Sequence, residues 1–390
     1  MGSWRADTLR LCTLKFLLGV EDKQPFIWQL AVFLESLDGK LPEGWESIVV
    51  VCNDHDELSP DLSRVLSTYR IRHYCAPNRS RHVSMDFIGG TKPYGPINKI
   101  TVLETAAPHI QPDDNVCLTD SDVFLYGDLN TEIFPDGNAL CDNWLIKKPL
   151  FYSDQKRDEG VDLEKLLESI GVARGFRGGG VIVFLKGETL RNQAFIRGCF
   201  RFTQVLYLLG KIKNVRTAWI AEMPAYALSL AVHEIDYEIV DRPEFAVETD
   251  DDRSVPEGSF YHYYARSAFW SSPWAKAQFQ SRDLLRADLE RFDRLAQSAH
   301  EKYFFALAAQ ARARLDDKAG PPSSPTPRSA RGWIEGRVAD PLRYLHFHIQ
   351  AAMDHKAASH RDLKLSRTMR MLYAGLSPIR GLRRRIARRG

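Results

Sequence analysis

Long apolar stretches are missing from this chain of 390 residues. No run of about 18 or more apolar residues occurs, so we expect no transmembrane helix. The most apolar early segment, residues 11–20, is interrupted by Lys15, and no small-residue cleavage site follows it. We therefore expect a buried first strand there rather than a secretion signal. No internal repeat is visible in the sequence.

Cysteine is also scarce, with six residues scattered along the chain and no C-x-x-C pair. This pattern argues against a structural zinc site and against a disulfide framework. Several of the cysteines lie in or beside predicted strands, so we expect buried thiols in a reducing compartment. A cytoplasmic location is the corresponding expectation.

The composition itself is ordinary, with 44% hydrophobic and 26% charged residues. A chain of this length can bury a large core, and we expect one large domain with an appendage. Its formal net charge of +3 conceals an asymmetry, because residues 361–390 contain ten Lys or Arg against one acid, Asp362. This basic, partly apolar tail is compatible with a peripheral position on an anionic membrane at its inner face, or with a solvated tail. Nucleic-acid binding is not expected, since interleaved aromatic residues are few.

The first half of the chain alternates between strand-like and helix-like patterns. Strands are predicted at residues 9–20, 47–52 and 70–75 and in the segment that carries Asp120, and helices at 25–37 and 97–107. Repeated β-α-β alternation predicts an α/β fold, with a mostly parallel sheet and helices on both faces. Ligands of such sheets collect beyond the carboxyl ends of the strands.

The second half predicts a different organisation. We divide the chain into an α/β domain, a single long amphipathic helix, a Pro- and Ser-rich linker and a basic helical C-terminal tail, at residues 1–280, 281–317, 318–332 and 333–390. The helix is predicted from a stripe of apolar residues at helical spacing, and the linker from its composition.

Three Asp-x-Asp triplets occur, at residues 54–56, 120–122 and 250–252. The last lies in a polar stretch, which indicates a solvated loop, and the first follows a predicted strand, where acids are often only turn formers. The middle triplet differs because apolar residues flank it on both sides, and acids near a core need a cation or hydrogen-bond donors. Carboxylates are the ligands that Mg²⁺ and Mn²⁺ prefer. We therefore predict a divalent cation at Asp120 and Asp122.

Four segments appear in a recognisable order: Ile97-Asn98-Lys99-Ile100, the strand ending in the acid pair, its continuation at 123–129, and residues 176–184. In this order they resemble the GT-A-fold glycosyltransferases, in particular the glycogenin and bacterial lipopolysaccharide galactosyltransferase-type families. The resemblance covers about residues 9–275. It implies a GT-A-like (Rossmann-like) domain, here with a helical C-terminal extension. It also implies a D-x-D pair that holds Mn²⁺ and a nucleotide diphosphate sugar.

The resemblance assigns the metal to Asp120, Asp122 and His262, with Asp120 also near the ribose. His262 lies in the run Phe260-Tyr261-His262-Tyr263-Tyr264, at the position of the family's third ligand. Neutral imidazole suits Mn²⁺. A histidine among aromatic residues is equally compatible with a packed core position.

On the donor side, the resemblance assigns the base to Asp54. Lys99, on the predicted helix before the acid strand, is placed to reach a phosphate oxygen as a point charge, although an exposed lysine is an equal alternative. Gly179, in the turn Gly178-Gly179-Gly180, would let substrate approach backbone amides, or it forms a plain tight turn.

The sequence also departs from the family pattern. Where relatives carry Gly and then Lys-Pro-Trp after the histidine, the nearest counterparts here are Arg266 and Pro273-Trp274. Arg266 is predicted to neutralise the departing diphosphate. Where relatives carry Asp-Gln on the late helix, this chain has Glu222, which we predict to orient the acceptor or to act as a base. The stereochemical outcome stays open.

These observations predict a metal-dependent glycosyltransferase that moves a hexose from a nucleotide diphosphate sugar, UDP-linked by resemblance, to a glycan, lipid-linked or protein acceptor. Two alternatives remain. One is a non-catalytic membrane-associated interaction protein on a degenerate transferase fold. The other is a sugar nucleotidyltransferase, but that class usually has a Gly-rich basic loop after the first strand, and residues 20–25 have none.

Overall fold

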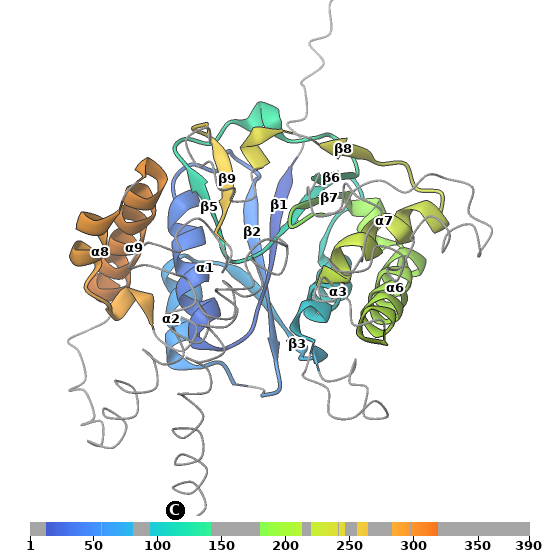
Figure 1. Ribbon diagram of the computed structural model, residues 1–390, viewed down its shortest axis with the longest axis horizontal. Coiled ribbons are helices and arrows are strands. Elements are labelled where there is room, and N and C mark those ends of the chain that lie inside the picture. Colours follow the sequence, from blue (N-terminus) through green and yellow to red (C-terminus); the bar gives the residue numbers. More distant parts are fainter. Residues whose placement is uncertain are drawn as a thin grey trace, which may run out of the picture. The chain divides into compact units, whose positions relative to one another are not determined.

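The computed structural model describes residues 13–55, 57–80, 94–141, 180–212, 220–240, 242–245, 256–263, 283–296 and 298–318 (Figure 1). The chain divides into two compact units, residues 1–321 and 322–390. The second unit, and with it the basic tail, lies outside the described residues. Every element discussed below lies in the first unit.

A seven-stranded sheet in the order β3-β2-β1-β4-β7-β6-β8 forms the centre of this unit. In that order the strands are Arg72–Pro77, Glu46–Asn53, Leu14–Val20, Asn115–Thr119, Val183–Lys186, Ala139–Cys141 and Glu238–Val240. β1 pairs in parallel with β2 and β4, whereas β7 runs antiparallel to β4 and β6. The central strands are almost continuously apolar and buried, as expected for strands covered on both faces. The predicted mostly parallel α/β sheet is confirmed.

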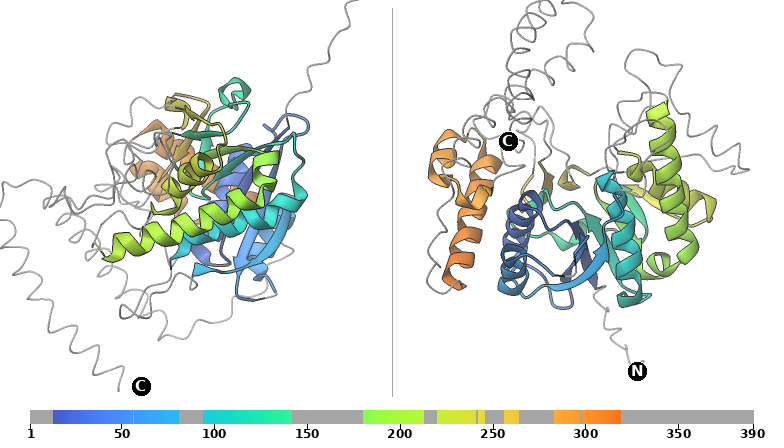
Figure 2. Two further views of the ribbon diagram at one scale, coloured as in Figure 1. Left: turned by 90° about the vertical axis from the view of Figure 1, so that its right-hand side faces the viewer. Right: turned by 90° about the horizontal axis from the view of Figure 1, so that it is seen from below.

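Helices cover both faces of the sheet (Figures 1 and 2). One side carries α1 (Gln24–Leu37) and α2 (Pro60–Thr68), and the other α3 (Asn98–Ala106), α6 (Gln193–Ile212) and α7 (Glu222–Val232), with the short α5 (Gly187–Arg191) leading into α6. A Cβ atom at Gly19 would lie 2.6 Å from Cγ2 of Val102, so this glycine lets α3 pack closely against β1. The 3-10 turns η3 (Gly95–Ile97), η4 (Ala107–His109), η5 (Thr131–Ile133) and η9 (Pro243–Phe245) complete the connections.

A separate two-stranded ribbon joins distant parts of the chain. β5 (Val123–Tyr126) leaves β4 after a three-residue turn and pairs antiparallel with β9 (Ser259–His262), so that Val123 lies opposite His262. At the far end of the ribbon, Gly127 and Gly258 adopt φ angles of +81° and +86°, which favour glycine. This pairing brings residue 262 to the end of β4.

The prediction of one long helix at 281–317 is wrong. The structure has η13, α8 and α9 instead, at Leu284–Arg286, Leu289–Leu295 and Ala299–Lys318. Each begins at its own capping side chain, namely Asp283, Asp288 and Ser298. Ser298 and Glu301 form a reciprocal capping box, in which Ser298 N–H also donates to the Glu301 carboxylate at 2.9 Å. The apolar residues do recur at helical spacing, but the capping residues divide the segment into separate helices.

Two further expectations concern the residues that the structure describes. None of the helices within them combines the length and the apolar character needed to cross a bilayer. Of the five cysteines in these ranges, four are buried and Cys75 is exposed, and no disulfide joins any of them.

Candidate active site

The acid pair lies where the strand order reverses. Strands β2 and β3 follow one another on one side of β1, and the next strand, β4, pairs with β1 on its other side. At such a switch point the loops after the two central strands diverge and leave room for a ligand. Asp120 and Asp122 occupy the turn directly after β4, and the hydroxyl of Ser121 between them donates to Gln29 of α1 at 3.1 Å. The contact with Gln29 therefore holds the turn against α1, and the two carboxylates lie at the edge of the sheet where β4 ends.

His262 completes a three-residue cluster with these acids. Ligand atoms of Asp120, Asp122 and His262 all lie within 4.8 Å of one another. Nε2 of His262 lies 3.2 Å from Oδ1 of Asp122 and 4.0 Å from Oδ2 of Asp120. The ribbon pairing explains the approach, since Tyr263 N–H donates to the Asp122 carbonyl at 3.1 Å. The structure therefore brings together the three residues predicted as metal ligands.

The chemistry of this cluster suits a divalent cation. Burial lowers the pKa of His262 to about 4; the carboxylate of Asp120 opposes that shift and the nearby Lys99 adds to it. The imidazole is therefore neutral at pH 7, which is the form that binds metals. Two carboxylate oxygens and one imidazole nitrogen are suitable ligands for Mn²⁺, and acceptable ones for Mg²⁺. The residues present fit the predicted ion.

Lys99 provides a fixed positive charge beside the acids. It projects from α3, and its Nζ lies 2.8 Å from Oδ1 of Asp120 and 3.0 Å from Oε1 of Glu222. Burial lowers the pKa of Lys99, but the two carboxylates outweigh burial, and the net pKa is raised. The ammonium is therefore charged over the physiological range and lies between two carboxylates, rather than on the exposed surface.

Glu222 lies beneath this lysine on the buried side of the site. Its side chain is 1% exposed, and it begins α7. One carboxylate oxygen accepts from Lys99, and the other accepts from the hydroxyl of Tyr94 at 2.6 Å. The sequence did not indicate Tyr94, because no local pattern reports a contact between residues so far apart in the chain.

A second polar group lies beyond the ends of β1 and β3. The side-chain amide of Asn98 donates to Glu21 at 3.2 Å and to Asn78 at 3.0 Å. Asp54, predicted to contact the base, is exposed just after β2, at the same edge of the sheet. Glu21 and Asn78 were missed, although both follow predicted strands and the strand-end argument would have found them.

Two predicted site residues, Gly179 and Arg266, lie outside the described residues. Gly180, which follows Gly179 in the chain, is described, and a Cβ atom there would lie 2.4 Å from the carbonyl oxygen of Cys141. Close packing against β6 therefore explains why position 180 is a glycine.

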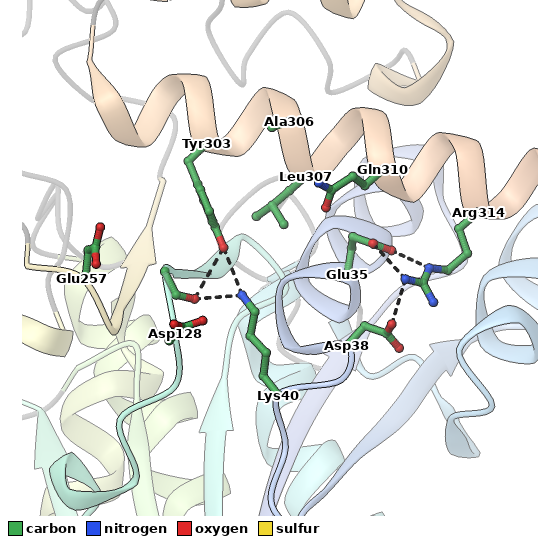
Figure 3. A pocket seen from close by; sticks show the side chains of 11 residues that line it. Glu35, Asp38, Lys40, Asp128, Glu257, Tyr303, Ala306, Leu307, Gln310 and Arg314 are labelled. Atoms are coloured by element: carbon green, nitrogen blue, oxygen red, sulfur yellow. Dashed lines mark hydrogen bonds and ion pairs between the residues drawn. The ribbon is translucent and has the colours of Figure 1, made fainter.

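A separate polar pocket lies at the other end of β5, beside α9 (Figure 3). Its volume is about 500 Å³, and its lining includes Gly127 and Tyr303. Lys40 donates to the carbonyl of Gly127 at 2.8 Å and to the hydroxyl of Tyr303 at 3.0 Å. Arg314 pairs with Glu35 at 2.9 Å and with Asp38 at 2.8 Å. These contacts fasten α9 to α1 and to the end of the ribbon.

We expect Arg314→Met to lower the free energy of unfolding by about 1 kcal/mol. Among the described residues, the substitution leaves the buried carboxylate of Glu35 with the Tyr69 hydroxyl, which donates to it at 2.8 Å. The cost is modest because Arg314 is itself 38% exposed. Urea denaturation measures the change, and Arg294→Met on the exposed surface of α8 is the matched control. Equal stability of the two variants would show that this ion pair does not secure α9.

The fold is that of an α/β protein with a mostly parallel sheet, and the candidate site lies at the switch point of that sheet. No protein-family model and no curated protein matches the sequence. Among solved structures, the WbbM bifunctional glycosyltransferase is 11% identical with a TM-score of 0.44, over 77% of this chain and 52% of that one. The galactosyltransferase LgtC, in complex with donor and acceptor sugar analogues, is 14% identical with a TM-score of 0.42, over 75% and 99%. Mouse xyloside xylosyltransferase 1 is 11% identical with a TM-score of 0.36, over 64% and 96%.

All three of these proteins are named as glycosyltransferases. The chain spans about half the length of the WbbM structure.

Proposed function

We propose that this protein is a metal-dependent glycosyltransferase that moves a hexose from a nucleotide diphosphate sugar to a glycan, lipid-linked or protein acceptor. The observation that carries the proposal is the cluster of Asp120, Asp122 and His262 at the switch point of the sheet, with Lys99 beside it. Transfer of a sugar from such a donor leaves a diphosphate, and the main electrostatic demand is to stabilise its charge.

In this proposal Asp120, Asp122 and His262 hold the cation. A bound Mn²⁺ or Mg²⁺ would supply Lewis acidity toward the diphosphate oxygens. Lys99 adds a permanent positive charge next to the same oxygens, without any proton transfer. Because imidazole is a better ligand for Mn²⁺ than for Mg²⁺, we propose Mn²⁺ as the preferred ion.

The nucleoside part of the donor would lie over the ends of β1 to β3, where the structure has Glu21, Asp54 and Asn78. The support is positional, since these polar residues continue the edge on which the acid pair lies. We propose UDP as the nucleotide, with Asp54 toward the base. Arg266 remains a proposed partner of the leaving diphosphate, and Gly179 a proposed point where substrate approaches backbone amides.

A thermal-shift experiment with UDP and MnCl₂, together and separately, tests the proposal. A ligand that binds only the folded state raises the melting temperature, by about 5 °C at a hundred times its dissociation constant. We expect this rise only when UDP and Mn²⁺ are both present, and its loss on addition of EDTA. The absence of any metal-dependent shift with UDP or with other nucleoside diphosphates would reject the enzyme and favour an interaction protein.

A further inference from the structure

Tyr94 makes two hydrogen bonds to the first residue of α7. The tyrosine is 3% exposed and precedes the 3-10 turn η3. Its hydroxyl donates to Oε2 of Glu222 at 2.6 Å and accepts from the backbone N–H of Glu222 at 3.2 Å. A phenol that donates and accepts at the same residue fixes both the backbone and the carboxylate of that residue.

The tyrosine ring is itself held in place. It packs on the ring of Tyr207 in α6, with centroids 4.1 Å apart, and its backbone N–H donates to the carbonyl of Ser80 at 2.8 Å. Burial, with the nearby carboxylate of Glu222, raises the pKa of Tyr94 well above its ordinary value. The hydroxyl is therefore a permanent donor at physiological pH.

We propose that Tyr94 is a positioning residue that acts on the active site through Glu222 and Lys99. The hydroxyl of Tyr94 holds one oxygen of Glu222, and the other oxygen holds the ammonium of Lys99 at 3.0 Å. The same ammonium lies 2.8 Å from Asp120. The inference rests on the proposed function, because that function gives Lys99 the task of meeting the donor diphosphate.

The physical reason is the flexibility of lysine. Its ammonium is a point charge on a four-carbon stem and has no planar geometry to set its direction. Two carboxylates at fixed positions are needed to localise it, and only Glu222 is buried enough to act as a rigid anchor, being 1% exposed against 23% for Asp120. Without the Tyr94 hydroxyl, Oε2 of Glu222 would lose the hydrogen bond that fixes it, and the carboxylate could move together with the flexible lysine. Small displacements of a charge that meets a reacting group have large effects on rate.

The test compares Tyr94→Phe with Tyr226→Phe, a matched control on α7, the helix that Glu222 begins. Tyr226 is 1% exposed, and within the described part of the chain its hydroxyl has no hydrogen-bond partner. Calorimetric titration of UDP in saturating Mn²⁺ gives affinity, and sugar-transfer or donor-hydrolysis assays give kcat. We expect Tyr94→Phe to weaken UDP binding and to lower kcat by about tenfold each. We expect the UDP affinity and kcat of Tyr226→Phe to stay within about twofold of the native values. The melting temperatures of both variants show whether either is destabilised.

Repeating the Tyr94→Phe substitution in a Lys99→Met variant distinguishes a positioning role of Tyr94 from a general effect on stability. In Lys99→Met the ammonium is gone, so Tyr94→Phe is expected to cause no further loss of UDP affinity. Equal losses in both backgrounds, or no loss in the native one, would overturn the inference. Glu222→Gln probes the same link should Tyr94→Phe fold poorly, and unchanged UDP affinity in that variant would also overturn it. A native protein that binds no UDP with Mn²⁺ rejects the proposed function, whereas native binding with an unaffected Tyr94→Phe rejects only this inference.

Discussion

Asp122→Ala is expected to abolish metal-dependent UDP binding and to lower sugar transfer by roughly 10³-fold. The side chain is 14% exposed and lies 3.2 Å from the imidazole nitrogen of His262. Removing it takes away one of the three proposed ligands and the acidic neighbour of the imidazole. A loss of about 4 kcal/mol in transition-state stabilisation corresponds to this factor in rate.

The measurement combines calorimetric titration of UDP in the presence of Mn²⁺ with a sugar-transfer assay. Asp293→Ala, which removes an exposed carboxylate from α8, serves as the matched control and should leave both quantities unchanged. The folded state should survive in both variants, as circular dichroism would show. Undiminished UDP binding by Asp122→Ala, still dependent on Mn²⁺, would place the cation elsewhere.

Lys99→Met is expected to lower the free energy of unfolding by about 3 kcal/mol. The substitution removes the ammonium that pairs with the buried Glu222, and it leaves that carboxylate near Asp120 without compensation from Lys99. Removing one partner of a buried ion pair costs more than the pair contributes, because the remaining charge is stranded away from water. Urea denaturation followed by circular dichroism measures the change.

A double variant tests the cause of this loss. Glu222→Gln in the Lys99→Met background removes the stranded charge and keeps the shape, so we expect it to recover more than about 1 kcal/mol. Lys302→Met, at an exposed position of α9, should stay within about 0.5 kcal/mol of the native protein. If Lys99→Met matches Lys302→Met in stability, the lysine does not form the buried network described here.

Much of the sheet was predictable because its strands are short apolar runs. The strands β1, β2 and β4 and the helices α1 and α3 appear within a few residues of their predicted positions. The helix α2 was missed, although Ser59 caps it and Pro60 begins it, a pattern typical of a helix start. The prediction of one long helix at 281–317 was wrong because it rested on the spacing of apolar residues and ignored the capping residues. The side chains of Asp288 and Ser298 cap the starts of separate helices.

The candidate site also contains residues that the sequence predicts and residues that it does not. The acid pair could be predicted from the sequence. A short apolar run indicates a buried strand, and acidic residues directly after such a run indicate the exposed end of that strand. The position of His262 was reached by resemblance alone, since only the pairing of β5 with β9 places it beside Asp122.

By itself, then, the sequence determined the α/β class, the order of the central elements and the acid pair, because these follow from hydrophobic period and residue type over short stretches. Only the tertiary structure decided that Lys99 joins Asp120 to Glu222 and that Tyr94 holds Glu222 from the other side. The residues of that network come from η3, α3, the end of β4 and α7. Their contacts arise from how helices pack across a sheet, which no local pattern of residues encodes.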